Sequence, residues 1–238
     1  MKLIDALLDL AFPGKCIFCH NLLWKEDDND NSICNSCENV LPYTTASNGI
    51  TKGDFIAKCV SPLFYRDNVR DSIHRFKFYR CRFYAKPYAK LIKECLLMHP
   101  DIKFDYITWV PLSKKRYRQR GYDQAQCLAE ALARIIDVPI WGMLRKIRDT
   151  KAQSTLTDKS QRRANIAGAY TLADGIDING LNILLIDDVV TTGATLSECA
   201  KVLLLNGAER IYCATVAKAG SSKVKPKKIS SEVSHANN

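Results

Sequence analysis

Apolar runs alternate with helical patterns along the middle of the chain. Runs typical of buried strands lie near residues 55–64, 105–111, 138–141, 183–188 and 210–217. Between them, apolar residues at helical spacing predict helices near 68–78, 84–98, 121–136 and 195–206. Strands that alternate with helices indicate βαβ units, so we expect an α/β fold in which helices flank a mostly parallel, twisted sheet.

The two ends of the chain follow other patterns. The first residues form a helical stripe of apolar side chains that Asp5 and Asp9 interrupt, which is unlike a secretory signal. The last residues are basic and have few apolar positions, as in disordered segments. We therefore expect an N-terminal helix and cysteine-rich module at 1–50, the α/β domain at 51–219 and a disordered basic tail at 220–238.

Composition and charge narrow the class of protein. The 238 residues are 47% hydrophobic and 25% charged, as in globular proteins, and no apolar run approaches the ~20 residues of a membrane span. The net charge is +10, yet residues 1–50 hold 3 basic against 7 acidic residues, so the positive charge lies in the rest of the chain. This excess suits anions such as phosphate, although solubility alone also accounts for it.

Four of the ten cysteines form two CxxC pairs, Cys16 with Cys19 and Cys34 with Cys37. Two such turns supply four thiolates for a structural zinc ion, which leaves no open position for catalysis. A knuckle of free thiols and a redox pair are the alternatives. The other six cysteines lie among apolar neighbours, which is typical of a reducing compartment, so we expect a cytoplasmic protein.

A second motif runs from Ile183 to Thr195. Four apolar residues predict a buried strand, and Asp187 and Asp188 follow at its carboxyl end, where open α/β sheets bind ligands. A threonine-rich loop with one glycine then opens a helix, whose first amides and dipole favour a phosphate. The two carboxylates suit sugar hydroxyls, so the motif fits a ribose 5-phosphate. A simple helix cap is the alternative, but a cap requires only one such residue.

Residues 183–195 resemble the 13-residue motif by which type I phosphoribosyltransferases bind 5-phosphoribosyl 1-pyrophosphate (PRPP). Together with the four cysteines, the chain from about Phe12 to Ala217 resembles the ComF family of competence proteins, which has a GntX-like branch. The segments 110–114, 118–125 and 148–168 support the resemblance. Asp123 departs from the family pattern, which usually has Asn at this position.

The resemblance implies a type I phosphoribosyltransferase fold with a small zinc finger, PRPP bound with Mg²⁺, and roles for particular residues. Asp187 and Asp188 would meet the ribose hydroxyls, directly or through Mg²⁺, and Ser113 and Lys114 would form the pyrophosphate loop. The family's mobile lid would include Arg148, Lys151 and Arg162, although a solvated loop is the alternative. The implied PRPP-binding set is Ser113, Lys114, Asp187, Asp188, Val189, Val190, Thr191, Thr192, Gly193, Ala194 and Thr195, with Asp187, Asp188 and Lys114 as the catalytic candidates.

Basic and aromatic residues interleave in two stretches. Residues 64–93 hold nine Lys/Arg and eight aromatic residues, and a second cluster includes Lys115, Arg116, Arg118 and Arg120. Cations beside aromatic rings suit single-stranded nucleic acid, whereas aromatics at helical spacing also fit a core.

Three functions remain open. The first, which the family resemblance favours, is a competence protein that binds PRPP and handles single-stranded DNA during natural transformation. The second is a metabolic phosphoribosyltransferase acting on a base or amine. The third is a PRPP-sensing adaptor that docks a competence helicase or other transformation proteins. No segment identifies the acceptor, so turnover stays open.

Overall fold

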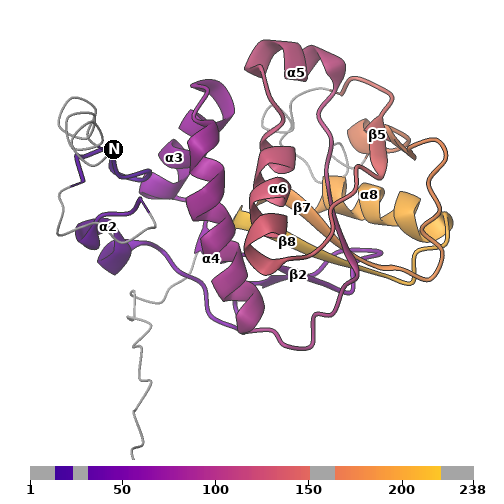
Figure 1. The fold of residues 1–238 in the computed structure, drawn as a ribbon, viewed down its shortest axis with the longest axis horizontal. Coiled ribbons are helices and arrows are strands. Elements are labelled where there is room, and N and C mark those ends of the chain that lie inside the picture. The colour runs from indigo at the N-terminus through magenta and orange to yellow at the C-terminus, as the bar shows by residue number, and fades with distance from the viewer. Residues whose placement is uncertain (1–13, 24–31, 151–163, 221–238) are drawn as a thin grey trace, which may run out of the picture.

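In the computed structural model, which describes residues 14–23, 32–150 and 164–220, a mostly parallel sheet lies between two layers of helices (Figure 1). The strands follow the order β1-β2-β8-β7-β4, and β3 extends the pairing of β8. Only the β1–β2 pair in this sheet is antiparallel. The predicted α/β fold with a mostly parallel sheet is confirmed. The strands are β1 (Ile50–Thr51), β2 (Lys58–Val60), β3 (Leu63–Phe64), β4 (Tyr106–Trp109), β7 (Asn182–Val190) and β8 (Arg210–Lys218).

The helices cover both faces of this sheet. α4 packs on β8 and on α6, and α6 lies over β4 and β7, while α8 and the small hairpin β5–β6 cover the other face. The helices are α2 (Asn35–Val40), α3 (Asp67–Phe78), α4 (Ala85–Leu97), α5 (Lys114–Arg120), α6 (Gln124–Ile136) and α8 (Ala194–Leu205), with the 3₁₀ turn η2 (Arg82–Tyr84); the hairpin is β5 (Leu144–Lys146) and β6 (Tyr170–Leu172).

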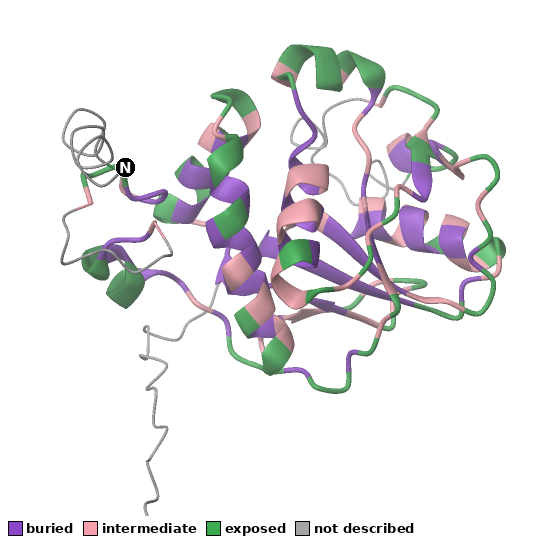
Figure 2. Ribbon diagram, viewed as in Figure 1, coloured by how far each residue is buried: buried purple, intermediate pink, exposed green. Residues whose placement is uncertain are grey.

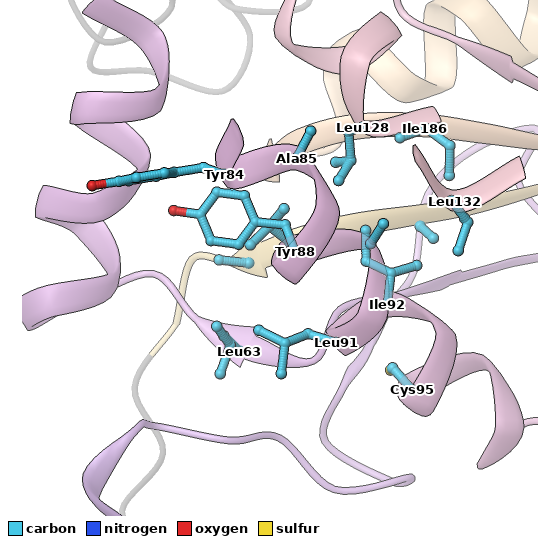
Figure 3. Close-up of a cluster of buried hydrophobic side chains, with 14 of the residues drawn as sticks. Leu63, Tyr84, Ala85, Tyr88, Leu91, Ile92, Cys95, Leu128, Leu132 and Ile186 are labelled. Atoms are coloured by element: carbon cyan, nitrogen blue, oxygen red, sulfur yellow. The ribbon is translucent and has the colours of Figure 1, made fainter. Parts of the chain in front are cut away.

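β7 divides the core between its two faces. Leu184 and Ile186 belong to the cluster shared with α3, α4 and α6, whereas Ile183 and Leu185 belong to the cluster shared with α8. Figure 3 shows Ile186 beside Leu128 and Leu132 of α6, and the rings of Tyr84 and Tyr88 in another part of the same cluster. Because successive side chains of a strand point to opposite faces, the apolar run of β7 is buried on both sides.

The structure departs from the expected elements in three places. Residues 138–141 form only an isolated bridge, Ile140 to Ile107, rather than a strand. The run 55–64 is divided into β2 and β3 on either side of Pro62, which lacks an amide hydrogen for the ladder. The helix expected from residue 121 begins at Gln124, because Gly121 ends the preceding helix α5 with a φ of 79°.

None of the helices in the described ranges is both long and apolar enough to cross a lipid bilayer. The expected N-terminal helix at the first residues, the lid residues Lys151 and Arg162, and all but the first residue of the expected tail lie outside the described residues.

Candidate functional site

Asp187 and Asp188 lie at the carboxyl end of β7 and point to opposite faces of the sheet. Asp188 follows Leu184 and Ile186 to the side of α3, where its Oδ1 lies 2.8 Å from Nζ of Lys77. Asp187 lies on the side of α8 and β6. Burial and, to a smaller degree, the charge of Asp187 raise the pKa of Tyr170 on β6. The two carboxylates therefore straddle the end of one strand.

Burial, followed by the charge of Asp188, raises the pKa of Asp187 to about 8. Lys77 opposes this rise, and Oδ1 of Asp187 accepts the amide hydrogen of Asp188 at 2.8 Å. The protein surroundings therefore do not fully compensate the charge of an ionised Asp187, and the carboxyl keeps its proton up to about pH 8. Carboxylate oxygens are the ligands that Mg²⁺ prefers, so the pair fits a hard cation or two hydroxyl donors.

The loop after β7 lines the same cleft. Gly193, with a φ of 77°, is the residue before α8, and the amide of Ala194 donates weakly to Oγ1 of Thr192 at 3.5 Å. A residue other than glycine rarely adopts this conformation. Thr191, Gly193, Ala194 and Thr195 all line the cleft. The twelve-residue helix that starts here directs its positive dipole end toward the carboxylates.

Asp123 fixes the loop that follows β4. It caps α6 by accepting the amide hydrogens of Ala125 at 3.0 Å and Gln126 at 3.2 Å, and its other oxygen accepts the amide of Leu112 at 2.7 Å. Burial raises the pKa of Asp123 to about 6. Asp123 therefore uses one oxygen to cap α6 and the other to hold Leu112. An Asn side chain has only one acceptor oxygen and cannot make both contacts in this way.

α5 divides the predicted basic cluster between two faces. Arg116 and Arg120, four residues apart, line the cleft with Asp187 and Asp188, whereas Lys114, Lys115 and Arg118 are exposed. Figure 2 shows that most of α5 is exposed. Burial lowers the pKa of Arg120, and the charge of Asp188 acts against this shift. Ser113 caps α5 through the amide of Arg116 at 3.4 Å. Arg116 and Arg120, grouped with nucleic-acid residues on sequence grounds, thus line the same cleft as the carboxylates.

Lys146 on β5 was not singled out in the sequence, because the short β5–β6 hairpin was not predicted. It lines both the cleft and a second hollow of about 610 Å³ that also holds Ser113 and Lys114. Burial, and then the charge of Arg116, lowers the pKa of Lys146 to about 8. Arg148, predicted in the lid, lies beside this hollow and donates to the carbonyls of Asn165 and Ala167.

α3 supplies the opposite wall of the cleft, which has a volume of about 980 Å³. Its lining side chains are spaced at helical intervals and comprise Arg70, Asp71, His74, Lys77 and Phe78. The rings of His74 and Phe78 lie 4.8 Å apart, and the guanidinium of Arg120 lies over Phe78 at 5.0 Å. The sequence showed these residues only as part of a basic, aromatic stretch. The structure separates them from the buried Phe64, Phe76, Tyr84 and Tyr88.

The four cysteines of the two CxxC pairs meet at one point. Their sulfur atoms all lie within 4.8 Å of one another, and Sγ of Cys19 and Sγ of Cys34 are 3.6 Å apart. Four thiolates around zinc at about 2.3 Å stand roughly 3.8 Å from one another, so the cluster fits a tetrahedral ion. Burial and then the charge of Cys16 raise the pKa of the Cys37 thiol. Bound metal would stabilise the thiolates.

Comparisons with known proteins agree with this architecture. The profile of the phosphoribosyl transferase domain matches residues 123–237. Competence protein F of Haemophilus influenzae is 30% identical over 220 residues, which cover 89% of this chain and 93% of that protein.

Two further matches are more partial. The DNA utilization protein YhgH of Salmonella typhimurium is 32% identical over 149 residues, which cover 59% of this chain and 64% of that protein, less than two thirds of its length. A solved structure of adenine phosphoribosyltransferase matches 72% of this chain and 85% of its own, with 13% sequence identity and a TM-score of 0.39. On the strength of the match to competence protein F, which covers most of both chains, this chain belongs to the ComF family of competence and DNA utilization proteins.

Proposed function

We propose that the chain binds PRPP together with Mg²⁺ in the cleft between α3 and the loop after β7. The observation that carries this proposal is that two carboxylates and the first residues of α8 line one cleft. In this assignment the loop from Val189 to Thr195 holds the 5-phosphate, and Asp187 and Asp188 accept hydrogen bonds from the ribose hydroxyls. Mg²⁺ would supply charge neutralisation for the pyrophosphate.

The cations around the cleft support a polyanionic ligand. Arg116, Arg120 and Lys146 reach it from α5 and β5. Lys114 lines only the second hollow, next to Ser113. We therefore assign the pyrophosphate to the region between Lys146 and Arg116. In this assignment Lys146 and Arg116, rather than Lys114, supply most of the positive charge that binds it.

We propose a structural zinc ion at Cys16, Cys19, Cys34 and Cys37. The module of residues 1–50 would then be held by the metal and by its contacts with the domain of residues 51–219. Ile17 and Phe18, next to the cluster, are fully or almost fully buried against α3 and α4, and Phe18 packs edge-on against Tyr88. Small modules rarely bury enough apolar surface to fold alone, and a bound metal compensates for this.

We propose that single-stranded DNA binds along the exposed side of α5 and the neighbouring end of α3. Lys115 and Arg118 face solvent there, and the large aromatic side chains of Tyr79, Phe83 and Tyr117 are more than half exposed. Exposed rings beside cations are what base stacking and backbone binding require. The competence and DNA utilization relatives support a role in DNA uptake and transformation, and a transformation helicase is a candidate partner.

A metabolic phosphoribosyltransferase is the second candidate. The side chains of His74 and Phe78 line the cleft opposite the carboxylates, where an acceptor base would approach the ribose. Release of pyrophosphate in the presence of one defined base or amine would favour this function over DNA handling.

Calorimetric titration of the zinc-loaded chain with PRPP and Mg²⁺, with and without a short single-stranded DNA, tests the proposal. We expect micromolar or tighter PRPP binding, which corresponds to about 8 kcal/mol or more. Absence of PRPP binding in both conditions would reject the ligand assignment and leave only the DNA and partner functions.

A further inference from the structure

α3 holds the backbone of the first cysteine turn. The carbonyl of Ile17 accepts hydrogen bonds from Oγ of Ser72 and, at 3.0 Å, from Nη2 of Arg75, and the carbonyl of Phe18 accepts from the same nitrogen at 2.7 Å. Ile17 and Phe18 lie between the two cysteines of the first pair. The position of Arg75 is fixed further by Tyr84, whose hydroxyl accepts from Nε at 3.3 Å.

The same helix holds one of the two carboxylates. Lys77 Nζ lies 2.8 Å from Asp188 Oδ1, and the two side chains retain only 22% and 12% of their exposure. Arg75 and Lys77 are two residues apart, which corresponds to about 200° around a helix of 3.6 residues per turn. One side chain therefore reaches the cysteine turn while the other reaches the cleft.

α3 is packed tightly enough to connect the two contacts. Val69, Ile73 and Phe76 are fully buried, Phe76 packs against the rings of Tyr88 and Tyr122, and its carbonyl accepts from the hydroxyl of Tyr122. Since a close-packed helix moves as a unit rather than deforming locally, a change in how the cysteine turn holds Arg75 displaces Lys77.

We infer that α3 couples the four-cysteine cluster to the ribose site, with Lys77 as the positioning residue for Asp188. This inference rests on the proposed binding of zinc and PRPP. Lys77 occupies Oδ1 of Asp188 and leaves the second oxygen, which has its own acceptor sites, to a ligand hydroxyl. Metal at the cysteines would hold the backbone of Ile17 and Phe18, which Arg75 contacts. Through Arg75 and α3 it would then fix the position of Lys77 and so the orientation of the Asp188 carboxylate.

The coupling makes a reciprocal prediction. PRPP must raise the affinity of the cluster for zinc by the same factor by which zinc raises the affinity for PRPP. We expect a factor of about five or more, the lower end of common couplings between sites. A zinc module that only stabilised the fold would show no dependence of zinc affinity on PRPP in an already folded chain.

The experiment measures zinc affinity of the full-length chain by competition with a chelator, with and without saturating PRPP and Mg²⁺, and measures PRPP affinity calorimetrically. In the wild type, zinc affinity should rise about fivefold with PRPP. Lys77→Met should weaken PRPP binding about tenfold and reduce the coupling factor to one, and Lys77→Arg should recover both. Lys201→Met, which removes an exposed helical lysine of α8, is the matched control and should change neither.

Arg75→Met tests the other end of the link, since it keeps all four thiolates and the carboxylate pair. We expect it to retain zinc while PRPP binding weakens and the coupling factor falls. If zinc and PRPP both bind to the wild type with a coupling factor of one, the inference is wrong while the proposed function stands. If PRPP does not bind at all, the proposed function fails and the inference fails with it.

Discussion

Nζ of Lys146 donates a hydrogen bond to the hydroxyl of Tyr170 at 3.2 Å, and the ammonium also lies over the Tyr170 ring, 5.0 Å from its centre. The two residues pair across the β5–β6 hairpin. The contact holds a partly buried lysine between the cleft and the second hollow. It places a titrating positive charge where the pyrophosphate is assigned.

This arrangement predicts pH-dependent binding of pyrophosphate. The pKa of Lys146 is lowered to about 8, so its charge is present at pH 7 and is lost as the pH rises through this value. Pyrophosphate affinity should therefore fall as the pH rises through about 8, where half of the lysine charge is lost. Asp187, with a pKa raised to about 8, ionises over the same range, and its carboxylate repels a free anion but attracts Mg²⁺.

Lys146→Arg separates the two contributions, because an arginine stays charged throughout this range. We expect the arginine variant to lose much of the decline between pH 7.5 and 9.5, and Lys146→Met to bind pyrophosphate weakly at every pH. Titration calorimetry with pyrophosphate and Mg²⁺ measures both. Wild-type and arginine profiles that coincide would remove Lys146 from the site.

Replacing both carboxylates should abolish PRPP binding without unfolding the chain. Asp187→Asn with Asp188→Asn keeps the shape of both side chains but replaces two carboxyl groups that can ionise against the ligand, and a hydrogen bond to a charged group contributes about 1.5–3 kcal/mol. The expected loss is on the order of 100-fold or more in affinity, measured calorimetrically, with unchanged zinc content. Asp174→Asn, at an exposed ion pair with Arg145, is the matched control. Normal PRPP binding by the double variant would show that the ligand site is elsewhere.

The sequence predicted the central features of the site because they are local. A four-residue apolar run followed by two acids, and two CxxC turns, each carry their chemistry within a few residues. The contribution of α3 was not predictable in the same way. Lys77 pairs with Asp188 across more than one hundred residues of sequence, and its role depends on the direction in which the helix packs. Likewise, only the packing of α5 separates Arg116 and Arg120 from Lys115 and Arg118.

Loss of one cysteine should release the metal and destabilise the N-terminal module. Cys37→Ser removes one of four thiolates from a buried cluster, and structural zinc contributes on the order of 10 kcal/mol in small fingers. Metal analysis should show zinc far below one equivalent, and thermal unfolding should occur at a lower temperature. Cys81→Ser, outside the cluster, should keep its metal. Full zinc occupancy of Cys37→Ser would contradict the four-thiolate assignment.

Asp123 should contribute to stability through the hydrogen bonds that it accepts. Asp123→Ala removes the cap of α6 and leaves the amide of Leu112 without its acceptor, at a cost of about 1–3 kcal/mol. Asp123→Asn keeps an acceptor for the cap and should recover part of this loss. Urea unfolding at pH 7.5 measures both variants. Equal stability of the alanine variant and the wild type would show that the cap and the loop contact contribute nothing measurable.

The division of α5 into two faces predicts separate effects on DNA and on PRPP. Lys115→Ala with Arg118→Ala removes two exposed cations from the proposed DNA surface but leaves Arg116 and Arg120 in the cleft. For single strands, the salt dependence of binding falls by roughly 0.7 per neutralised phosphate, so the slope should decrease by about 1.4. Fluorescence anisotropy with a labelled oligonucleotide at several salt concentrations measures this slope.

The same variant should bind PRPP with wild-type affinity, whereas Arg116→Ala with Arg120→Ala should show the opposite pattern and lose mainly PRPP. Lys103→Ala with Lys201→Ala, two exposed lysines outside α5, controls for the general loss of positive charge. Because the net charge falls by two in all three double variants, only a local role of α5 predicts different outcomes. Equal losses of DNA affinity in the control and in Lys115→Ala with Arg118→Ala would mean that the positive charge of the chain as a whole, and not this helix face, attracts the strand.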